Sequence, residues 1–203
     1  MGKIFLVMGK SATGKDTIFR KLLEIEKLNL KTVVTYTTRP IRTGEEHGRE
    51  YFFVDNEKRE QLLADGKIIE QRSYDTVHGV WYYFTANDGQ IDLDHTNYIM
   101  IQTLEGYNQI RKYYGANQVI PIYIEVEDGE RLQRALDRER VQKEPKYAEL
   151  CRRYLADTAD FSDENIRALG IDKRYQNKEM DDCITLIYED ILSLIKESKE
   201  SFL

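Results

Sequence analysis

The feature that most constrains the fold is the junction of a short apolar run with a glycine-containing loop near the N-terminus. Residues 4–8 read Ile-Phe-Leu-Val-Met, enough for one buried strand, and Gly9 follows them directly. Gly14 and Lys15 come next at the end of the loop, and a helix-compatible run begins at Thr17. A strand, Gly-x4-Gly-Lys and then a helix form the context of a phosphate-binding loop, where backbone N–H groups, a helix N-terminus and a lysine surround an anion. The alternative is a plain glycine turn between two core elements.

One position of this loop departs from the usual pattern. Asp16 follows Lys15, where a Ser or Thr hydroxyl normally meets Mg²⁺, and Thr17 comes after it. A carboxylate is an acceptable hard-oxygen ligand for magnesium, directly or through water, although it adds negative charge beside phosphates. Asp16 is therefore the candidate metal ligand.

The overall charge excludes one large class of partners. The 203 residues carry a formal net charge of −6, whereas a nucleic-acid-binding protein needs a basic face. An anionic substrate must then be held by a local cluster of Arg and Lys. The apolar run at residues 4–8 is too short for a signal peptide or a membrane span, so we expect a cytoplasmic protein with no membrane partner. The oligomeric state stays open.

Length and composition indicate one substantial core, with or without small inserted lobes. An apolar content of 41% and a charged content of 33% are typical of a soluble globular protein. Cys151 and Cys183 are isolated and lack metal-ligand spacing, so we expect them to pack as small apolar residues in a reducing compartment. These features favour an α/β enzyme or binding module.

A β-rich segment interrupts the α/β pattern. Residues 31–38 are rich in β-branched side chains and predict a second strand. We expect further strands at 51–54, 67–70 and 80–85, and a helix over 56–65 that ends at Gly66. Residues 35 to about 88 thus form a small lobe.

Buried-strand and helix patterns resume after this lobe. Residues 98–101 and 120–124 predict strands, and Pro121 is tolerated only at the first position or an edge. A charged helical region covers 128–154, and residues 180–199 predict an amphipathic helix that packs on the core. The fold class is α/β, a parallel sheet flanked by helices.

Two groups of side chains can bind an acceptor opposite the phosphate loop. Arg39 and Arg42 lie three apart in a glycine-containing loop, and Tyr51 follows; two guanidinium forks can clamp a phosphate, although the segment also fits a solvated hairpin. Glu70 ends an apolar strand, and its carboxylate can accept from the N1–H and N2–H₂ of guanine, a pair that adenine lacks. Alone, such a residue is more often a surface charge.

A third group can stabilise phosphoryl transfer. Arg134 and Arg138 are four residues apart on one helix face, and Arg153 follows on the next predicted helix. Positive charge around the migrating group is what phosphoryl transfer requires. The alternative is an exposed basic face, which the neighbouring Asp137 and Glu139 also fit.

Taken together, these residues resemble the guanylate kinase family over nearly the whole chain. The most specific stretch is Thr35 to Phe53, which is similar to the GMP-binding sequence of that family in residue type and spacing. The resemblance implies a P-loop fold made of a core (1–34, 89–127 and 158–203), a GMP-binding lobe (35–88) and a helical lid (128–157).

The resemblance also implies site residues. ATP would be bound by Gly9, Ser11, Ala12, Thr13, Gly14, Lys15, Asp16, Thr17 and Asn177. GMP would be bound by Thr35, Arg39, Arg42, Tyr51, Glu70, Tyr83 and Thr103. The catalytic residues would be Lys15, Arg134, Arg138 and Arg153, with Mg²⁺ at Asp16.

The chain departs from this family pattern at a second place. Ile101 and Thr103 stand where the family usually carries aspartates that help to hold the guanine and the metal, and Glu105 lies nearby. Thr103 can hydrogen-bond a base but brings no charge. This difference bears on guanine selection and on how Mg²⁺ is oriented.

We therefore expect a kinase that converts ATP and GMP to ADP and GDP. No side-chain nucleophile is needed, because the acceptor phosphate is already ionised. Two alternatives stay open, namely a related P-loop kinase for another phosphorylated acceptor and a non-catalytic module of similar fold. The intact phosphate loop favours catalysis over the second alternative.

Overall fold

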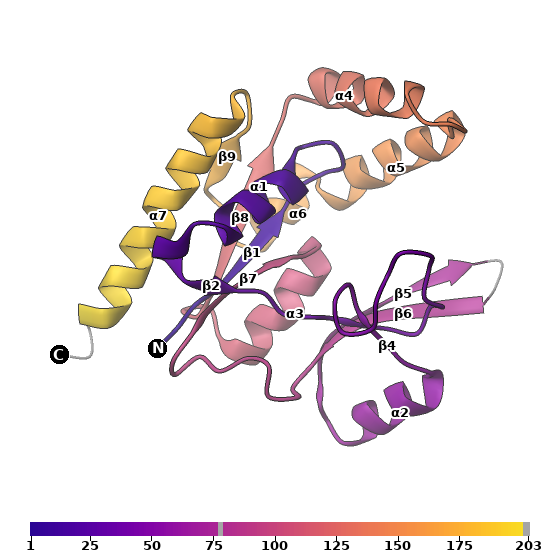
Figure 1. The fold of residues 1–203 in the computed structure, drawn as a ribbon. Helices are drawn as coiled ribbons and strands as arrows, with labels where there is room; N and C mark the ends of the chain where they lie inside the picture. The colour runs from indigo at the N-terminus through magenta and orange to yellow at the C-terminus, as the bar shows by residue number, and fades with distance from the viewer. Residues whose placement is uncertain (77–78, 201–203) are drawn as a thin grey trace.

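Two sheets organise the chain in the computed structural model, which describes residues 1–76 and 79–200 (Figure 1). The larger sheet has five parallel strands in the order β2-β7-β1-β8-β9. Its strands are β1 (Ile4–Met8), β2 (Leu30–Lys31), β7 (Asn97–Ile101), β8 (Val119–Glu125) and β9 (Arg174–Gln176). The prediction of a parallel sheet flanked by helices is confirmed.

Strand β1 is central because its apolar side chains serve both faces of this sheet. Ile4, Leu6 and Met8 join one core cluster, whereas Phe5 and Val7 join the other, as alternation along a strand requires. All five are fully buried, which is typical of a parallel strand covered on both sides.

Helices cover the two faces. The first face packs against α3 (Leu104–Tyr114) and α6 (Asp163–Ala168), and the second against α1 (Lys15–Leu23) and α7 (Met180–Glu200). Helix α7 buries Cys183, Ile187 and Ile191, which confirms the predicted amphipathic helix. Cys183 packs as an apolar residue, as expected, and its burial raises the pKa of the thiol to about 11, whereas the same expectation is wrong for Cys151, which is exposed. The short η1 (Glu26–Leu28) connects α1 to β2.

The second sheet has four strands in the order β4-β3-β6-β5 and is set to one side of the large sheet (Figure 1). Its strands are β3 (Tyr36–Thr37), β4 (Phe52–Phe53), β5 (Ile68–Thr76) and β6 (Gly79–Ala86). Helix α2 (Asn56–Ala64) begins after Asp55, whose side chain accepts from the Lys58 amide at 2.7 Å. A small core of Leu62, Phe84 and Ala86 joins this helix to the strands.

Two expectations about strands have different outcomes in the structure. The single strand predicted over 31–38 is wrong, because the chain crosses there from β2 in the large sheet to β3 in the small one. Pro121 lies within β8 but beyond the end of β9, since β9 pairs only with Tyr123–Glu125. Its missing N–H therefore costs no ladder bond on that side.

Two further helices, α4 (Asp128–Arg140) and α5 (Tyr147–Asp160), follow β8 and lie above the small sheet in Figure 1. They pack on each other, and α5 leads directly toward α6. No helix among the described residues has the length and apolarity needed to cross a membrane.

Candidate functional site

The phosphate loop connects β1 to α1 and depends on its two glycines. Gly9 leaves the strand with φ 155°, and a Cβ there would lie 2.5 Å from the Ile124 carbonyl oxygen. Gly14 precedes α1 in a left-handed conformation with φ 83°. Because the first amides of a helix lack intrahelical partners, the N-terminus of α1 presents donors to an anion at this loop.

Asn177 contacts the phosphate loop through a buried hydrogen bond. Its side chain is 1% exposed, and Nδ2 donates to the Thr13 carbonyl at 2.8 Å. A Cβ on Gly14 would lie 2.7 Å from the same Nδ2, so the glycine also makes room for this contact. Thr13 in turn donates its hydroxyl to the Lys10 carbonyl at 2.8 Å. Asn177, which the family resemblance places beside the ATP base, thus contacts the loop itself.

A basic cavity of about 150 Å³ opens between α4 and α5 beside Ser11. Among the predicted catalytic residues, Arg138 and Arg153 line it. Arg134 lies at a different edge, where its Nη2 donates to the Asn177 carbonyl at 3.2 Å and pairs with Glu130. The structure therefore places Arg138 and Arg153 beside Ser11 of the phosphate loop, whereas Arg134 contacts Asn177.

Four residues of this region were not predicted from the sequence. Lys10 Nζ lies 3.0 Å from Asp128, and Arg131, which is 1% exposed, donates to Asp128 at 3.1 Å. The Ser11 amide donates to the Asp157 carboxylate at 2.6 Å. Burial alone would raise the pKa of Asp128, but its bonds to Lys10 and Arg131 hold that pKa below the ordinary value.

One sequence signal could have found Asp157. It lies four residues after Arg153 and so shares a helix face with a predicted catalytic residue. The structure places this carboxylate on an amide of the phosphate loop. Arg131 lies 3.6 Å from the same carboxylate and offsets part of its charge.

The predicted acceptor-binding loop is arranged around Arg39. Its guanidinium donates to Glu45 at 2.7 and 2.6 Å, and its side chain is 4% exposed. These bonds lower the pKa of the Glu45 carboxyl to about 2. Glu45 also accepts from the Arg42 amide at 2.8 Å, and the Arg42 side chain remains exposed. Thr35, the other predicted residue of this stretch, accepts from the Phe52 amide through its carbonyl at 2.9 Å.

Aromatic rings continue this surface toward β5. Tyr51 lies 5.2 Å below the Arg39 guanidinium and meets Tyr83 edge-on at 5.6 Å. Tyr74 of β5 meets Tyr83 at the same distance, 5.6 Å. Burial raises the pKa of Tyr51, which keeps its hydroxyl protonated and able to donate. The two predicted tyrosines are thus brought together.

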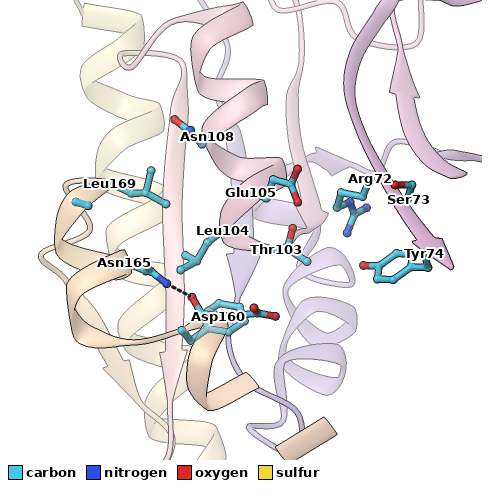
Figure 2. A pocket seen from close by; sticks show the side chains of 12 residues that line it. Arg72, Ser73, Tyr74, Thr103, Leu104, Glu105, Asn108, Asp160, Asn165 and Leu169 are labelled. Atoms are coloured by element: carbon cyan, nitrogen blue, oxygen red, sulfur yellow. Dashed lines mark hydrogen bonds between the residues drawn. The ribbon is translucent and has the colours of Figure 1, made fainter. Parts of the chain in front are cut away.

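A cleft of about 430 Å³ separates β5 from α3 and α6. Figure 2 shows Arg72, Tyr74, Thr103 and Asp160 around the same space, and Glu105 also lines the cleft. Thr103 caps α3 by accepting from the Gly106 amide at 3.1 Å. By contrast, Ile101 packs against the apolar core of the large sheet. Of the two positions that depart from the family pattern, Thr103 alone therefore lines the cleft.

Glu70 lies behind this cleft and is 1% exposed. Its Oε1 accepts from the Thr85 hydroxyl at 2.9 Å and from Gln102 Nε2 at 3.1 Å. Its Oε2 lies 3.3 Å from Arg72 Nε. The lining residue at this point of β5 is therefore Arg72, with the predicted carboxylate beneath it.

The donor set for a metal is small. The Asp16 side chain is 73% exposed and lies 3.6 Å from Lys15 Nζ. The described residues contain no group of three His, Cys, Asp or Glu side chains that could hold a metal ion. One carboxylate fits Mg²⁺ only together with substrate oxygens, which is how Mg²⁺ commonly binds beside nucleotide phosphates.

The phosphate loop and the cleft are neighbours. Strands β1 and β7 are adjacent, and the Gln102 amide donates to the Val7 carbonyl at 3.0 Å, so both strands end at one edge of the sheet. Asp157 bonds the phosphate loop, and Asp160, less than one turn later on α5, lines the cleft. An anion on the loop and a ligand in the cleft would thus lie side by side.

Comparisons with known proteins show the family. A family model described as guanylate kinase matches residues 1–184. A guanylate kinase from Nitrosomonas europaea is 31% identical over 166 residues, 81% of this chain and 78% of that protein. One from Porphyromonas gingivalis is 31% identical over 126 residues, 61% of this chain.

The chain covers less than two thirds of some relatives. The match spans 65% of the Porphyromonas protein, and a match to the Anaplasma phagocytophilum guanylate kinase, 43% identical, spans 33% of that protein. The crystal structure of guanylate kinase from Anaplasma phagocytophilum aligns with a TM-score of 0.63 at 23% identity. It covers 95% of this chain and 85% of the other, and it supports the fold.

Proposed function

The chain belongs to the guanylate kinase family, and we propose that it transfers the γ-phosphoryl group of ATP to GMP, yielding ADP and GDP. The observation that carries this proposal is the position of α5, which contacts the phosphate loop through Asp157 and the acceptor cleft through Asp160. Two phosphorylated ligands bound there would meet at the carboxyl edge of the sheet, as in-line transfer requires.

The donor is proposed to bind the loop of residues 9–17, with Lys15 on its phosphates. Arg138 and Arg153 face the loop from the lid and would offset the charge that develops during transfer. Arg134 would act at the Asn177 edge. A Mg²⁺ ion held by Asp16 and the ATP phosphates would neutralise phosphate charge.

The acceptor is proposed to bind between the second sheet and α3. Arg39, Arg42, Tyr51 and Tyr83 would hold the GMP phosphate, with Glu45 orienting the Arg39 fork. The base would enter the cleft lined by Thr103. An oxygen of the ionised GMP phosphate attacks the γ-phosphorus as the bond to ADP breaks, so no side-chain nucleophile is required. We propose that segments 35–88 and 128–157 close over the two ligands and exclude water.

The test is ADP release from ATP and Mg²⁺ with GMP, dGMP, AMP, CMP and UMP offered separately, beside Lys15→Ala. Turnover confined to guanine nucleotides, and lost in the variant, supports the proposal. Measurable ATP binding without turnover would favour another phosphorylated acceptor, an alternative that Ile101 and Thr103 motivate. No ATP binding would leave a non-catalytic module.

A further inference from the structure

The two walls of the 430 Å³ cleft come from different parts of the fold. Strand β5 of the second sheet contributes Arg72, Ser73 and Tyr74, and the start of α3 contributes Thr103 and Glu105 (Figure 2). Helix α3 is also the helix that packs directly on β5. The width of the cleft therefore depends on how the second sheet is held against α3.

Strand β5 turns an unpaired edge toward α3. It is the last strand of its sheet and pairs with β6 alone, so the backbone groups on its other edge need partners outside the sheet. Gln109 of α3 supplies both partners at Gln71. The Gln71 amide donates to Gln109 Oε1 at 3.0 Å, and the Gln71 carbonyl accepts from Gln109 Nε2 at 3.2 Å. The planar side-chain amide, with one acceptor and two donors, thus takes the place of a neighbouring strand at this residue.

The same side chain reaches the other wall of the cleft. Gln109 Nε2 also donates to Glu105 Oε1 at 3.3 Å, one turn earlier on α3. On the second sheet, Gln71 Oε1 accepts from Arg59 Nε at 2.9 Å and from Nη2 at 2.7 Å, and Arg59 is buried on α2. Contacts therefore run from α2 through Gln71 and Gln109 to Glu105.

These hydrogen bonds add direction to an apolar anchor. Ile69, two residues before Gln71 on β5, is buried in the core cluster that includes Tyr107 and Ile110 of α3. Apolar burial is non-directional, so Ile69 fastens β5 to α3 without fixing the angle between them. Two hydrogen bonds to the backbone of one residue are directional, and they fix that angle.

We infer that Gln109 is a positioning residue for the acceptor, which sets the separation of the two cleft walls by holding the edge of β5 against α3. This inference rests on the proposed function, in which GMP binds in this cleft. The donor is proposed to bind the loop of residues 9–17, whereas Gln109 contacts Gln71 and Glu105. Gln109 therefore affects the affinity for the acceptor and leaves the affinity for ATP unchanged.

The first experiment measures kcat and both KM values in the unmodified protein and in Gln109→Met, which keeps the side-chain length and removes the hydrogen bonds. We expect KM for GMP to rise about tenfold, with kcat within about threefold and KM for ATP unchanged. A merely structural role would lower the folded fraction, and so the apparent kcat, without changing KM for GMP. Lys112→Met, at an exposed position of the same helix, is the control and should change none of these values.

A second measurement uses the unmodified protein and stands even if Gln109→Met is unstable. If the junction between Gln71 and Gln109 favours GMP binding, GMP must in turn stabilise the junction. Hydrogen exchange of the Gln71 amide, followed by NMR, should then slow about tenfold or more at saturating GMP. The Leu63 amide of α2, in the same lobe, is the reference and should slow less.

Each contrary result has a separate meaning. An unchanged KM for GMP in folded Gln109→Met, equal rises in KM for GMP and ATP, or Gln71 exchange that does not respond to GMP would each overturn the inference and leave the proposed function standing. Absence of GMP phosphorylation by the unmodified protein would overturn the proposed function, and this inference with it.

Discussion

Replacement of Lys15 should lower the rate of phosphoryl transfer without lowering the stability of the fold. The Lys15 side chain is 20% exposed and its ion pair is with the exposed Asp16. We expect Lys15→Ala to lower kcat about a hundredfold or more, while the free energy of unfolding changes by no more than about 0.5 kcal/mol. Steady-state kinetics and urea unfolding measure the two quantities. Lys21→Ala removes a charge from the same helix, next to Asp181, and should leave kcat unchanged.

Asp157 places a negative charge where a nucleotide phosphate would bind. Because its carboxylate accepts from the Ser11 amide at 2.6 Å, an ATP phosphate bound to the loop as proposed would have to displace it. Asp157→Asn keeps the shape and removes the charge, so we expect ATP to bind roughly fivefold more tightly. Calorimetric titration with ATP measures this, with Asp137→Asn on α4 as the control. Unchanged affinity would show that the carboxylate does not compete.

Glu45 makes the acceptor loop sensitive to acid. Its bonds to Arg39 lower the pKa from 4.5 to about 2, so the stability that they contribute is present above pH 4.5 and is lost as the pH falls toward 2. Glu45→Gln should therefore lower the thermal unfolding midpoint near pH 6, and the gap to the unmodified protein should close across that window. A gap that is constant with pH would contradict this account. The exposed Glu144→Gln is the control.

The site residues differ in how readily they can be predicted from the sequence. The phosphate loop is recognisable because its function lies in a local spacing of Gly9, Gly14 and Lys15. Asp157 contacts the phosphate loop through Ser11, 146 residues away in the sequence. Apart from Arg153, no residue near it in the sequence indicates this contact. Glu70 is likewise held by two residues distant in sequence, since Thr85 and Gln102 donate to its carboxylate. Such roles depend on tertiary placement.

At the scale of elements, α7 covers one face of the large sheet and contributes buried residues to its core. Ile187 is fully buried in the cluster shared with β1, whereas its neighbour Leu186 is 45% exposed. We expect Ile187→Ala to lower the free energy of unfolding by about 2–5 kcal/mol, and Leu186→Ala to change it by about 0.5 kcal/mol or less. Urea unfolding followed by circular dichroism measures both. Equal losses would contradict the helix orientation.

Elements with a single strong local pattern were predictable, and elements defined by pairing were not. The run at β1 and the stripe on α7 are local patterns, and both predictions agree with the structure. The prediction of one strand over 31–38 was wrong because β-branched residues favour an extended chain but do not determine which strand it pairs with. The chain passes from one sheet to the other there. Strand β5 extends to Thr76 because β6 pairs with it along its length.

At the scale of the whole molecule, two separate sheets are joined beside one cleft. Gln71 of β5 and Gln109 of α3 form the junction, since the Gln71 amide donates to the Gln109 side chain at 3.0 Å and its carbonyl accepts in return at 3.2 Å. The cleft of about 430 Å³ opens next to this junction, between β5 and α3. The family and the fold follow from motif order along the sequence, whereas the way the two sheets meet does not.

The placement of Asp157 and Asp160 on one helix has a thermodynamic consequence. A nucleotide that displaced Asp157 from the phosphate loop would also displace the helical turn that bears Asp160, which lines the proposed acceptor cleft. The two binding equilibria are then coupled, and the coupling must be reciprocal, so GMP changes the Kd of a non-hydrolysable ATP analogue by the same factor as the analogue changes the Kd of GMP. Titrating each ligand in the presence and absence of the other measures both changes in Kd and tests whether they are equal. In Asp157→Asn, where the phosphate loop no longer holds a charge to be expelled, the factor should move toward one.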